Sequence, residues 1–313
     1  MNHLGFINLF KNSSFCANIQ VKMGGDNSVG VSLDIKRDDL IHSKVSGNKF
    51  RKLKYNILQA QRLQKDTLLT FGGAYSNHIS AVAAAGKMCG LKTIGVIRGE
   101  ELVSKIHENP TLSYAQECGM QLHYVSRADY KNKETDNFLA ELKEKFGDFY
   151  SLPEGGTNAL AVQGCQEILT DKDLVYDYIC APVGTGGTLA GLIAASTDSQ
   201  TVLGFSALKG SFQCSEINKY TSKSNYKIID AYCFGGYAKI DLQLVRFINE
   251  FKKETGIPLD PVYTGKMIFG IMDLLQKGYF KENSRILAVH TGGLQGIAGM
   301  NQRLIKKNLP IIE

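Results

Sequence analysis

A lysine at the start of a predicted helix is the residue in this sequence best suited to covalent chemistry. Lys49 is followed by apolar residues at helical spacing, which are Phe50, Leu53, Ile57 and Ala60. Ser46 or Asn48 could cap this helix, and Gly47 would allow a tight turn before it. The positive end of the helix dipole, together with burial, favours a neutral amine at Lys49, as Schiff-base chemistry requires. The alternative is a basic, solvated helix start. Its exposed face would then consist of Arg51, Lys52 and Lys54.

A glycine-rich turn at residues 182–191 is typical of phosphate binding. It joins an apolar strand to an apolar helix, where backbone N–H groups and the helix N-terminus converge. The spacing does not match the dinucleotide motif GxGxxG, because position 189 is Leu, and it does not match the nucleotide motif GxxxxGK[ST], because no Lys follows. A dinucleotide or nucleoside triphosphate is therefore not favoured as the ligand. The alternative is a tight turn that binds nothing. The residues expected to bind phosphate are Gly184, Thr185, Gly186, Gly187 and Thr188.

A second turn, after Gly72 and Gly73, offers a place for a carboxylate. Ser76 and Asn77 open a predicted helix there, so that a hydroxyl and an amide lie beside free helix N–H donors. The alternative is that both residues only cap the helix. His78 follows them and fits a structural histidine with satisfied hydrogen bonds better than a general base.

Three further turns could complete a site. Residues 153–158 form a glycine-rich turn that would line a cleft or only reverse the chain. Tyr263 lies in a predicted loop, where it would be a packing residue or, near an amine and a carboxylate, a proton-transfer group. Thr291 ends the last strand and could face a ring nitrogen. An amine, a phosphate cradle, a carboxylate seat, a tyrosine and a hydroxyl in one crevice of an α/β sheet suit pyridoxal phosphate with an amino-acid substrate.

The elements that must position these residues alternate between strand and helix. The predicted strands are 31–37, 67–71, 92–97, 121–125, 149–152, 178–183, 201–207, 227–232 and 285–290. The predicted helices after the Lys49 helix are 77–88, 110–119, 135–146, 159–169, 188–196, 214–220, 242–253 and 266–277. Strands separated by helices indicate an α/β fold with mainly parallel sheets covered on both faces. No linker-like segment divides the chain, so we expect two interwoven three-layer αβα domains with the cofactor in the cleft between them. The larger domain would comprise 1–45 and 151–313, and the smaller 46–150.

Composition excludes some classes of function. The chain has 313 residues, is 43% hydrophobic and carries a net charge of +6, without a long basic run that would suggest nucleic acid. Its seven cysteines contain no CxxC pair, so we expect no metal site, and a reducing cytoplasm fits best. Residues 1–6 lack a charged segment and a long apolar segment, and no apolar run has membrane-spanning length, so neither a signal peptide nor a membrane partner is expected.

Six short motifs follow one another along the chain, namely KRDDL at 36–40, GNKFRKL at 47–53, SNH at 76–78, GTGGT at 184–188, DPVYTGK at 260–266 and HTGG at 290–293. They resemble the motifs of the D-cysteine desulfhydrase and 1-aminocyclopropane-1-carboxylate deaminase family, fold-type II enzymes of the tryptophan-synthase β-subunit type. They occur in family order and extend from about residue 30 to 297.

The resemblance implies roles toward the cofactor, pyridoxal 5'-phosphate. Lys49 would hold it covalently and move the substrate α-proton. Asn77 would contact the ring oxygen of the cofactor, residues 184–188 would bind its phosphate, and Thr291 would face its pyridine nitrogen.

The resemblance also implies how a small amino-acid substrate is held. Ser76 and Asn77, with His78 beside them, would receive the substrate carboxylate. Tyr237 and Tyr263 would lie over the substrate. The catalytic residues would then be Lys49, Ser76 and Tyr263, and a second copy of the chain is expected to form a homodimer.

One position favours a particular reaction. The deaminase pattern has Glu after the loop tyrosine, whereas this chain has Thr264, which resembles the desulfhydrase side. The chain also has Tyr75 where Gln often precedes the Ser–Asn pair. We therefore expect a carbon–sulfur lyase that converts D-cysteine to pyruvate, sulfide and ammonia. The alternatives are deamination of 1-aminocyclopropane-1-carboxylate to 2-oxobutyrate and ammonia, and a non-catalytic protein that binds an amino acid or the cofactor.

Overall fold

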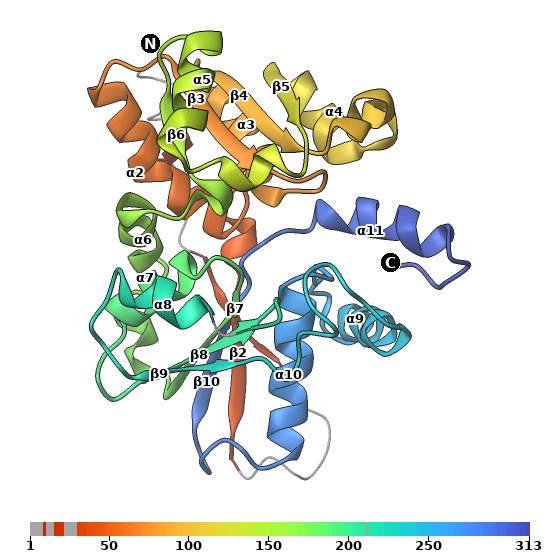
Figure 1. The fold of residues 1–313 in the computed structure, drawn as a ribbon. Coiled ribbons are helices and arrows are strands. Elements are labelled where there is room, and N and C mark those ends of the chain that lie inside the picture. Colours follow the sequence, from red (N-terminus) through yellow and green to blue (C-terminus); the bar gives the residue numbers. More distant parts are fainter. Residues whose placement is uncertain (1–8, 11–15, 22–29, 211) are drawn as a thin grey trace.

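The computed structural model describes residues 9–10, 16–21, 30–210 and 212–313 and contains two separate open sheets (Figure 1). Residues 1–6, from which we inferred the absence of a signal peptide, lie outside the described part. The six-stranded sheet has the order β1 (Asn18–Val21), β2 (Ser32–Lys36), β10 (Arg285–Val289), β7 (Tyr178–Val183), β8 (Thr201–Ser206) and β9 (Tyr226–Ile229). The four-stranded sheet has the order β5 (Met120–Val125), β4 (Lys92–Arg98), β3 (Thr67–Gly72) and β6 (Tyr150–Leu152). All neighbouring strands are parallel except β1 and β2.

Helices cover both faces of the six-stranded sheet. One face packs on α6 (Ala159–Gln166), α7 (Gly187–Ala195) and α8 (Phe212–Asn218). The other face packs on α9 (Leu242–Thr255), α10 (Thr264–Gln276) and α11 (Gly296–Ile305). In Figure 1 the two sets lie on opposite sides of the lower sheet. Each face therefore has its own hydrophobic core, as a sheet of buried parallel strands requires.

The four-stranded sheet is covered in the same way. Its larger core contains α2 (Asn48–Arg62), α3 (Asn77–Cys89) and α4 (Pro110–Glu117), and its smaller core contains α5 (Asp136–Phe146). Short 3-10 helices are η1 (Asp38–Leu40), η2 (Glu100–Glu108), η3 (Asp129–Asn132), η4 (Glu154–Gly156) and η5 (Asp171–Val175). The predicted fold class, a mainly parallel α/β fold with helices on both faces of each sheet, is confirmed. The domain boundaries near residues 45 and 151 stay a prediction.

Some local expectations were wrong. The antiparallel strand β1 and the helix α11 were not predicted, and β9 ends at Ile229 because turns begin at Asp230. The N-cap of α2 is Gly47, and no side chain caps this helix. The hydroxyl of Ser46 instead donates to the carbonyl oxygen of Asp39 at 2.8 Å, and the side-chain amide of Asn48 donates to Oγ1 of Thr188 at 2.8 Å.

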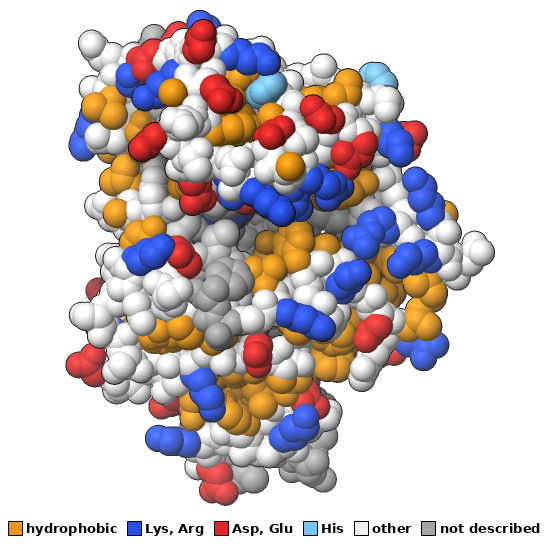
Figure 2. Space-filling view, in the orientation of Figure 1, with side chains coloured by type: hydrophobic (Ala, Val, Ile, Leu, Met, Phe, Trp, Pro, Cys, Tyr) orange, Lys and Arg blue, Asp and Glu red, His pale blue; other side chains and the backbone are white. Residues whose placement is uncertain are grey.

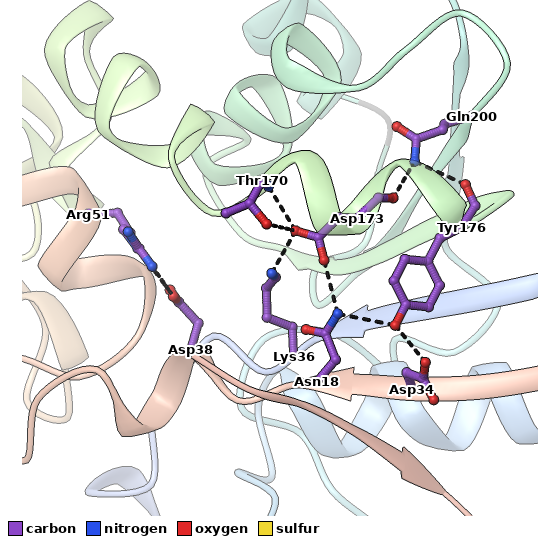
Figure 3. A network of polar contacts seen from close by, with 9 residues as sticks. All are labelled: Asn18, Asp34, Lys36, Asp38, Arg51, Thr170, Asp173, Tyr176 and Gln200. Atoms are coloured by element: carbon purple, nitrogen blue, oxygen red, sulfur yellow. Dashed lines mark hydrogen bonds and ion pairs between the residues drawn. The ribbon is translucent and has the colours of Figure 1, made fainter. Parts of the chain in front are cut away.

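Two buried ion pairs lie around the end of strand β2, and one of them reaches helix α2 (Figure 3). Lys36, at the end of β2, donates from Nζ to Asp173 at 2.7 Å, and Asn18 donates to the same carboxylate at 2.9 Å. Arg51 in α2 pairs with Asp38 in η1 at 2.7 Å. The helix that carries Lys49 is thereby tied to the strand end that precedes it.

No helix in the described part of the chain is long and apolar enough to cross a membrane. No group of three or more His, Cys, Asp or Glu residues there could hold a metal ion. The seven cysteines form no disulfide.

Candidate active site

Helix α2 begins directly against the end of strand β10. The backbone N–H of Asn48 donates to the carbonyl oxygen of Thr291 at 3.2 Å. Gly47 has φ +58°, and a Cβ on it would lie 2.1 Å from that oxygen, so only glycine fits here. The side chain of Lys49, the residue after Asn48, therefore extends from the helix next to the end of the last strand.

The amine of Lys49 is held loosely and in a partly buried position. Among the described residues, its Nζ makes one hydrogen bond, at 3.4 Å to the carbonyl oxygen of Gly155. Burial, and secondarily the charge of Lys52, lowers the pKa of Lys49 to about 7. A substantial fraction of the amine is then neutral near pH 7, and a neutral lysine amine can attack an aldehyde or accept a proton.

Lys52 is a site residue that the sequence analysis missed. It is 2% exposed, so the alternative that placed it on the exposed face of a basic, solvated helix start does not hold for Lys52. Its Nζ donates to the carbonyl oxygen of Gly155 at 3.0 Å and to Oγ1 of Thr157 at 2.9 Å, and burial lowers its pKa to about 8. The available signal was its spacing of three residues from Lys49, which places both amines on one helix face.

The glycine-rich turn after β7 forms a cradle at the N-terminus of α7. Gly186 is the N-cap with φ +86°, and no side chain caps the helix. Thr185 shares a 2.6 Å hydrogen bond with Thr157, and Thr188 accepts from Asn48 at 2.8 Å. The first N–H groups of α7 are therefore left for an anion, and the Lys52 ammonium lies one hydrogen bond from Thr157 on the same side.

These residues surround a cleft that opens to solvent, and the space in it, with its open mouth included, is about 520 Å³. Its lining is Asn48, Lys49, Lys52, Asn77, Gly155, residues 182–186, Thr188, Leu189, Tyr263, Thr291 and Gly292. All five turns singled out in the sequence contribute to it. Figure 2 shows the surface hollowed between the upper and lower parts of the molecule, with Lys and Arg side chains along the upper rim. Four expected site residues lie outside this lining, namely Ser76, His78, Gly187 and Tyr237.

Asn77 faces the cleft from the first turn of α3. Its amide oxygen accepts from Gln295 at 2.7 Å, which leaves its amide nitrogen to donate to a ligand. Ser76 is the N-cap of the same helix and accepts from the N–H of Ile79 at 3.3 Å. The capping alternative therefore holds for Ser76, while Asn77 lies at the cleft.

His78 differs from the expectation of a satisfied structural histidine. It is 2% exposed, and neither ring nitrogen has a hydrogen-bond partner among the residues that the structure describes. Its ring packs on the glycine turn, because a Cβ on Gly156 would lie 2.6 Å from its Cε1. Burial, with the nearby charges of Lys49 and Lys52, lowers the pKa of His78 well below its ordinary value, so the ring is neutral.

Tyr263 and Tyr237 form an edge-to-face pair beside the cleft. Their ring centroids lie 6.3 Å apart at 64°. Tyr263 lies, as predicted, in the turn before α10, where it is the N-cap of that helix. The carboxylate of Asp260 orders this turn by accepting from the backbone N–H groups of Val262, Tyr263 and Thr264. Burial raises the pKa of Tyr263 well above its ordinary value, so its phenol stays protonated at neutral pH.

Thr264, which stands where the deaminase pattern has Glu, has a structural role at the start of α10. It is fully buried, and its hydroxyl donates to Asp260 at 2.6 Å. It helps to close the first turn of α10 and leaves Tyr263 as the residue of this segment that lines the cleft.

A sequence profile described as "Pyridoxal-phosphate dependent enzyme" matches residues 24–292. The chain belongs to this family. Within the family, it is similar to an Arabidopsis thaliana protein named "Bifunctional D-cysteine desulfhydrase/1-aminocyclopropane-1-carboxylate deaminase, mitochondrial", with 30% identity over 86% of this chain and 74% of the relative. A protein of Bradyrhizobium sp. (strain ORS 278) named "1-aminocyclopropane-1-carboxylate deaminase" is 28% identical over 86% of this chain and 88% of its own.

A solved structure agrees with these relatives. The crystal structure of an ACC deaminase homologue superposes with a TM-score of 0.77 at 27% identity, over 97% of this chain and 99% of that one. The predicted resemblance to the D-cysteine desulfhydrase and 1-aminocyclopropane-1-carboxylate deaminase family, and the predicted cofactor, are confirmed.

The residues present fit pyridoxal phosphate. The uncapped N-terminus of α7, with Lys52 beside it, suits the phosphate, and the loosely held amine of Lys49 suits the aldehyde. Thr291 lines the cleft just after β10, and a hydroxyl suits a ring nitrogen. The cleft therefore offers suitable groups to the phosphate, the aldehyde and the ring nitrogen of pyridoxal phosphate.

Proposed function

We propose that this pyridoxal-phosphate-dependent lyase catalyses α,β-elimination on a small amino acid, with D-cysteine as substrate. The balanced reaction is D-cysteine plus water to pyruvate, hydrogen sulfide and ammonia. The observation that carries the proposal is the Lys49 amine, whose pKa is lowered to about 7 and which lines the same cleft as the 184–188 turn.

Binding and orientation fall to residues on both sheets. The N–H groups of the 184–188 turn and the Lys52 ammonium would hold the phosphate, and the Asn77 amide and the Thr291 hydroxyl would fix the ring. Pyridoxal phosphate supplies an electron sink that stabilises negative charge at the substrate α-carbon. Free N–H groups of the first turn of α3, beside Ser76 and Asn77, would receive the substrate carboxylate.

Proton transfer falls to two groups. Lys49 Nζ would accept the α-proton, after which the Cβ–S bond breaks and the electron pair leaves with sulfur. The phenol of Tyr263, protonated at neutral pH, would donate a proton to the departing thiolate. Tyr237, which is 49% exposed and packed on Tyr263, would return a proton from solvent.

Ring-opening deamination is the second candidate, and it is supported by the name of the Bradyrhizobium relative. That substrate has no α-proton for Lys49 to remove. In this chain the residue after Tyr263 is Thr264, which donates to Asp260, so the carboxylate of the deaminase pattern is missing at that position. These two points favour elimination from D-cysteine.

One preparation can decide between the candidates. Steady-state kcat/KM would be measured for pyruvate release from D-cysteine, L-cysteine and β-chloroalanine, and for 2-oxobutyrate release from 1-aminocyclopropane-1-carboxylate. We expect the highest value for D-cysteine. A higher value for the cyclopropane substrate would overturn the substrate assignment, and a colourless protein that releases neither product would support a non-catalytic binding protein.

A further inference from the structure

Lys266 is a buried lysine whose hydrogen bonds in the described part of the chain go to backbone carbonyls. It is 2% exposed and lies in the first turn of α10. Its Nζ donates to the carbonyl oxygens of Cys233 and Gly236, at 2.9 and 2.8 Å. No carboxylate in the described part of the chain lies within the 4.0 Å of a salt bridge. Burying an ammonium costs free energy unless its donors are satisfied, so these two carbonyl contacts are what keep it in place.

The two carbonyls belong to a tightly wound loop between β9 and α9. Phe234, Gly235, Gly236 and Ala238 all have positive φ, which is uncommon for the two non-glycine residues. The carbonyl of Cys233 also accepts from the N–H of Gly236 at 2.9 Å, and that of Gly236 accepts from the N–H of Lys239 at 3.1 Å. The ammonium therefore bridges two successive turns whose backbone conformation is strained.

Tyr237 lies directly after the second of these carbonyls. Its ring meets that of Tyr263, the N-cap of α10, which lies three residues before Lys266. The ring of Phe234 packs on Phe269 of α10 with centroids 5.0 Å apart, so the loop has an apolar contact with this helix as well. The start of α10 thus places Tyr263 at the cleft, and Lys266 and Phe269 of the same helix contact the loop that carries Tyr237.

We propose that Lys266 is a positioning residue that fixes Tyr237 on Tyr263 at the cleft. Lys266 would touch neither substrate nor cofactor. The role of Tyr237 toward substrate rests on the proposed function, whereas the ordering of the loop by Lys266 does not.

The first test measures the loop without any turnover. The chain contains no Trp, so Tyr237→Trp introduces a single fluorescent reporter at the loop. Its anisotropy and its quenching by acrylamide would be compared in the Lys266→Met background and in the Lys239→Met background, with and without pyridoxal phosphate. Lys239 is an exposed lysine of the same loop and serves as the matched control.

We expect Lys266→Met to lower the anisotropy and raise the quenching, and Lys239→Met to change neither. An unchanged reporter in folded Lys266→Met protein would overturn the proposal. If that variant does not fold, Lys266→Gln replaces it. Its amide can still donate but its side chain is shorter and uncharged, so we expect a change in the same direction and of smaller size.

The second test asks whether Lys266 acts through Tyr237. Lys266→Met should raise KM on the order of 10-fold with unchanged cofactor retention, because the tyrosine is displaced. In a Tyr237→Ala background the same change should add nothing, since the group being positioned is gone. A multiplicative effect of the two changes would show a general structural role and overturn the proposal. Absence of D-cysteine turnover in the parent protein would instead count against the proposed function and leave the fluorescence result standing.

Discussion

The ammonium groups of Lys49 and Lys52 meet at one acceptor, the carbonyl oxygen of Gly155, at 3.4 and 3.0 Å. Burial is the main reason that the pKa of Lys49 falls to about 7, and the charge of Lys52 adds to it. Lys52, which would hold the phosphate, therefore also favours the neutral amine that would bond to the aldehyde.

Borohydride reduction of the yellow protein should attach the cofactor irreversibly to Lys49, and peptide mapping would locate it. Lys49→Ala should lose this labelling and about three orders of magnitude in rate, because one residue is both covalent anchor and base. Lys54→Ala, on the same helix but paired with Glu167, is the control and should label normally. Labelling at another lysine would refute the assignment of the site.

The rate at which apoprotein takes up pyridoxal should rise with pH through about 7, the lowered pKa of Lys49, because the neutral amine is the reactive form. Lys52→Met should move this midpoint to higher pH, since removing a neighbouring positive charge raises the pKa. Pyridoxal without phosphate is used so that the lost phosphate contact does not interfere, and absorbance follows the reaction. A midpoint that moves downward would contradict the coupling.

Gly186→Asp should weaken cofactor affinity at least about tenfold, which is about 1.4 kcal/mol. The residue has φ +86°, and a carboxylate there would repel the phosphate. Gly186→Asn is the matched control, because Asn tolerates this conformation and has no charge. Equal affinities for the two variants in a fluorescence titration would show that charge at this turn does not matter.

Thr264→Glu recreates the residue of the deaminase pattern, but it would place a second carboxylate beside Asp260 in a fully buried position. We expect a loss of about 3 kcal/mol or more in the free energy of unfolding and no gain of 2-oxobutyrate release. Thr264→Val removes only the hydroxyl and should cost about 1–3 kcal/mol. Urea unfolding measures both, and a Glu variant as stable as the parent would contradict the placement of Thr264.

Lys36→Met should destabilise the fold by about 3–5 kcal/mol, because it leaves the buried carboxylate of Asp173 unpaired. Burial alone would raise the pKa of Asp173, but hydrogen bonds from Lys36 and Asn18 lower it overall. This stabilisation is therefore present above the unfolded-state pKa of about 4 and is lost as pH falls through the lowered value. In urea unfolding at several pH values, Lys92→Met, which breaks an exposed pair with Asp66, should cost less than about 1 kcal/mol.

Local patterns predicted most of the elements, because buried strands and amphipathic helices carry their period in the sequence. Strand 67–71 is observed as Thr67–Gly72, and helix 77–88 as Asn77–Cys89. Helix α10 was predicted to start at 266 but starts at Thr264. The side chain of Asp260 accepts from three backbone N–H groups before and at this start, and the sequence pattern does not reveal these hydrogen bonds.

The site was predictable where a residue's role depends on its own turn, as at Gly186. Lys52 was not predictable in this way, since its burial depends on Gly155 and Thr157, about a hundred residues later in the chain. The tie between Lys266 and the Tyr237 loop was missed for the same reason, because a lysine in a helix pattern looks solvated until its partners are known.

The backbone N–H of Asn48 donates to the carbonyl oxygen of Thr291, and Gly47 packs against the same oxygen. The lysine that would anchor the cofactor and the hydroxyl that would face its ring nitrogen therefore lie on two segments joined by backbone. Tyr237 belongs to another segment, since its loop is fastened to α10. In an evolving lineage, substitutions in that loop would alter which amino acid is accepted while the spacing that holds the cofactor is inherited unchanged. The segments that would hold the cofactor are thus separate from the loop that would contact the substrate. New substrate specificities would be expected to arise by changes around Tyr237 rather than around Lys49.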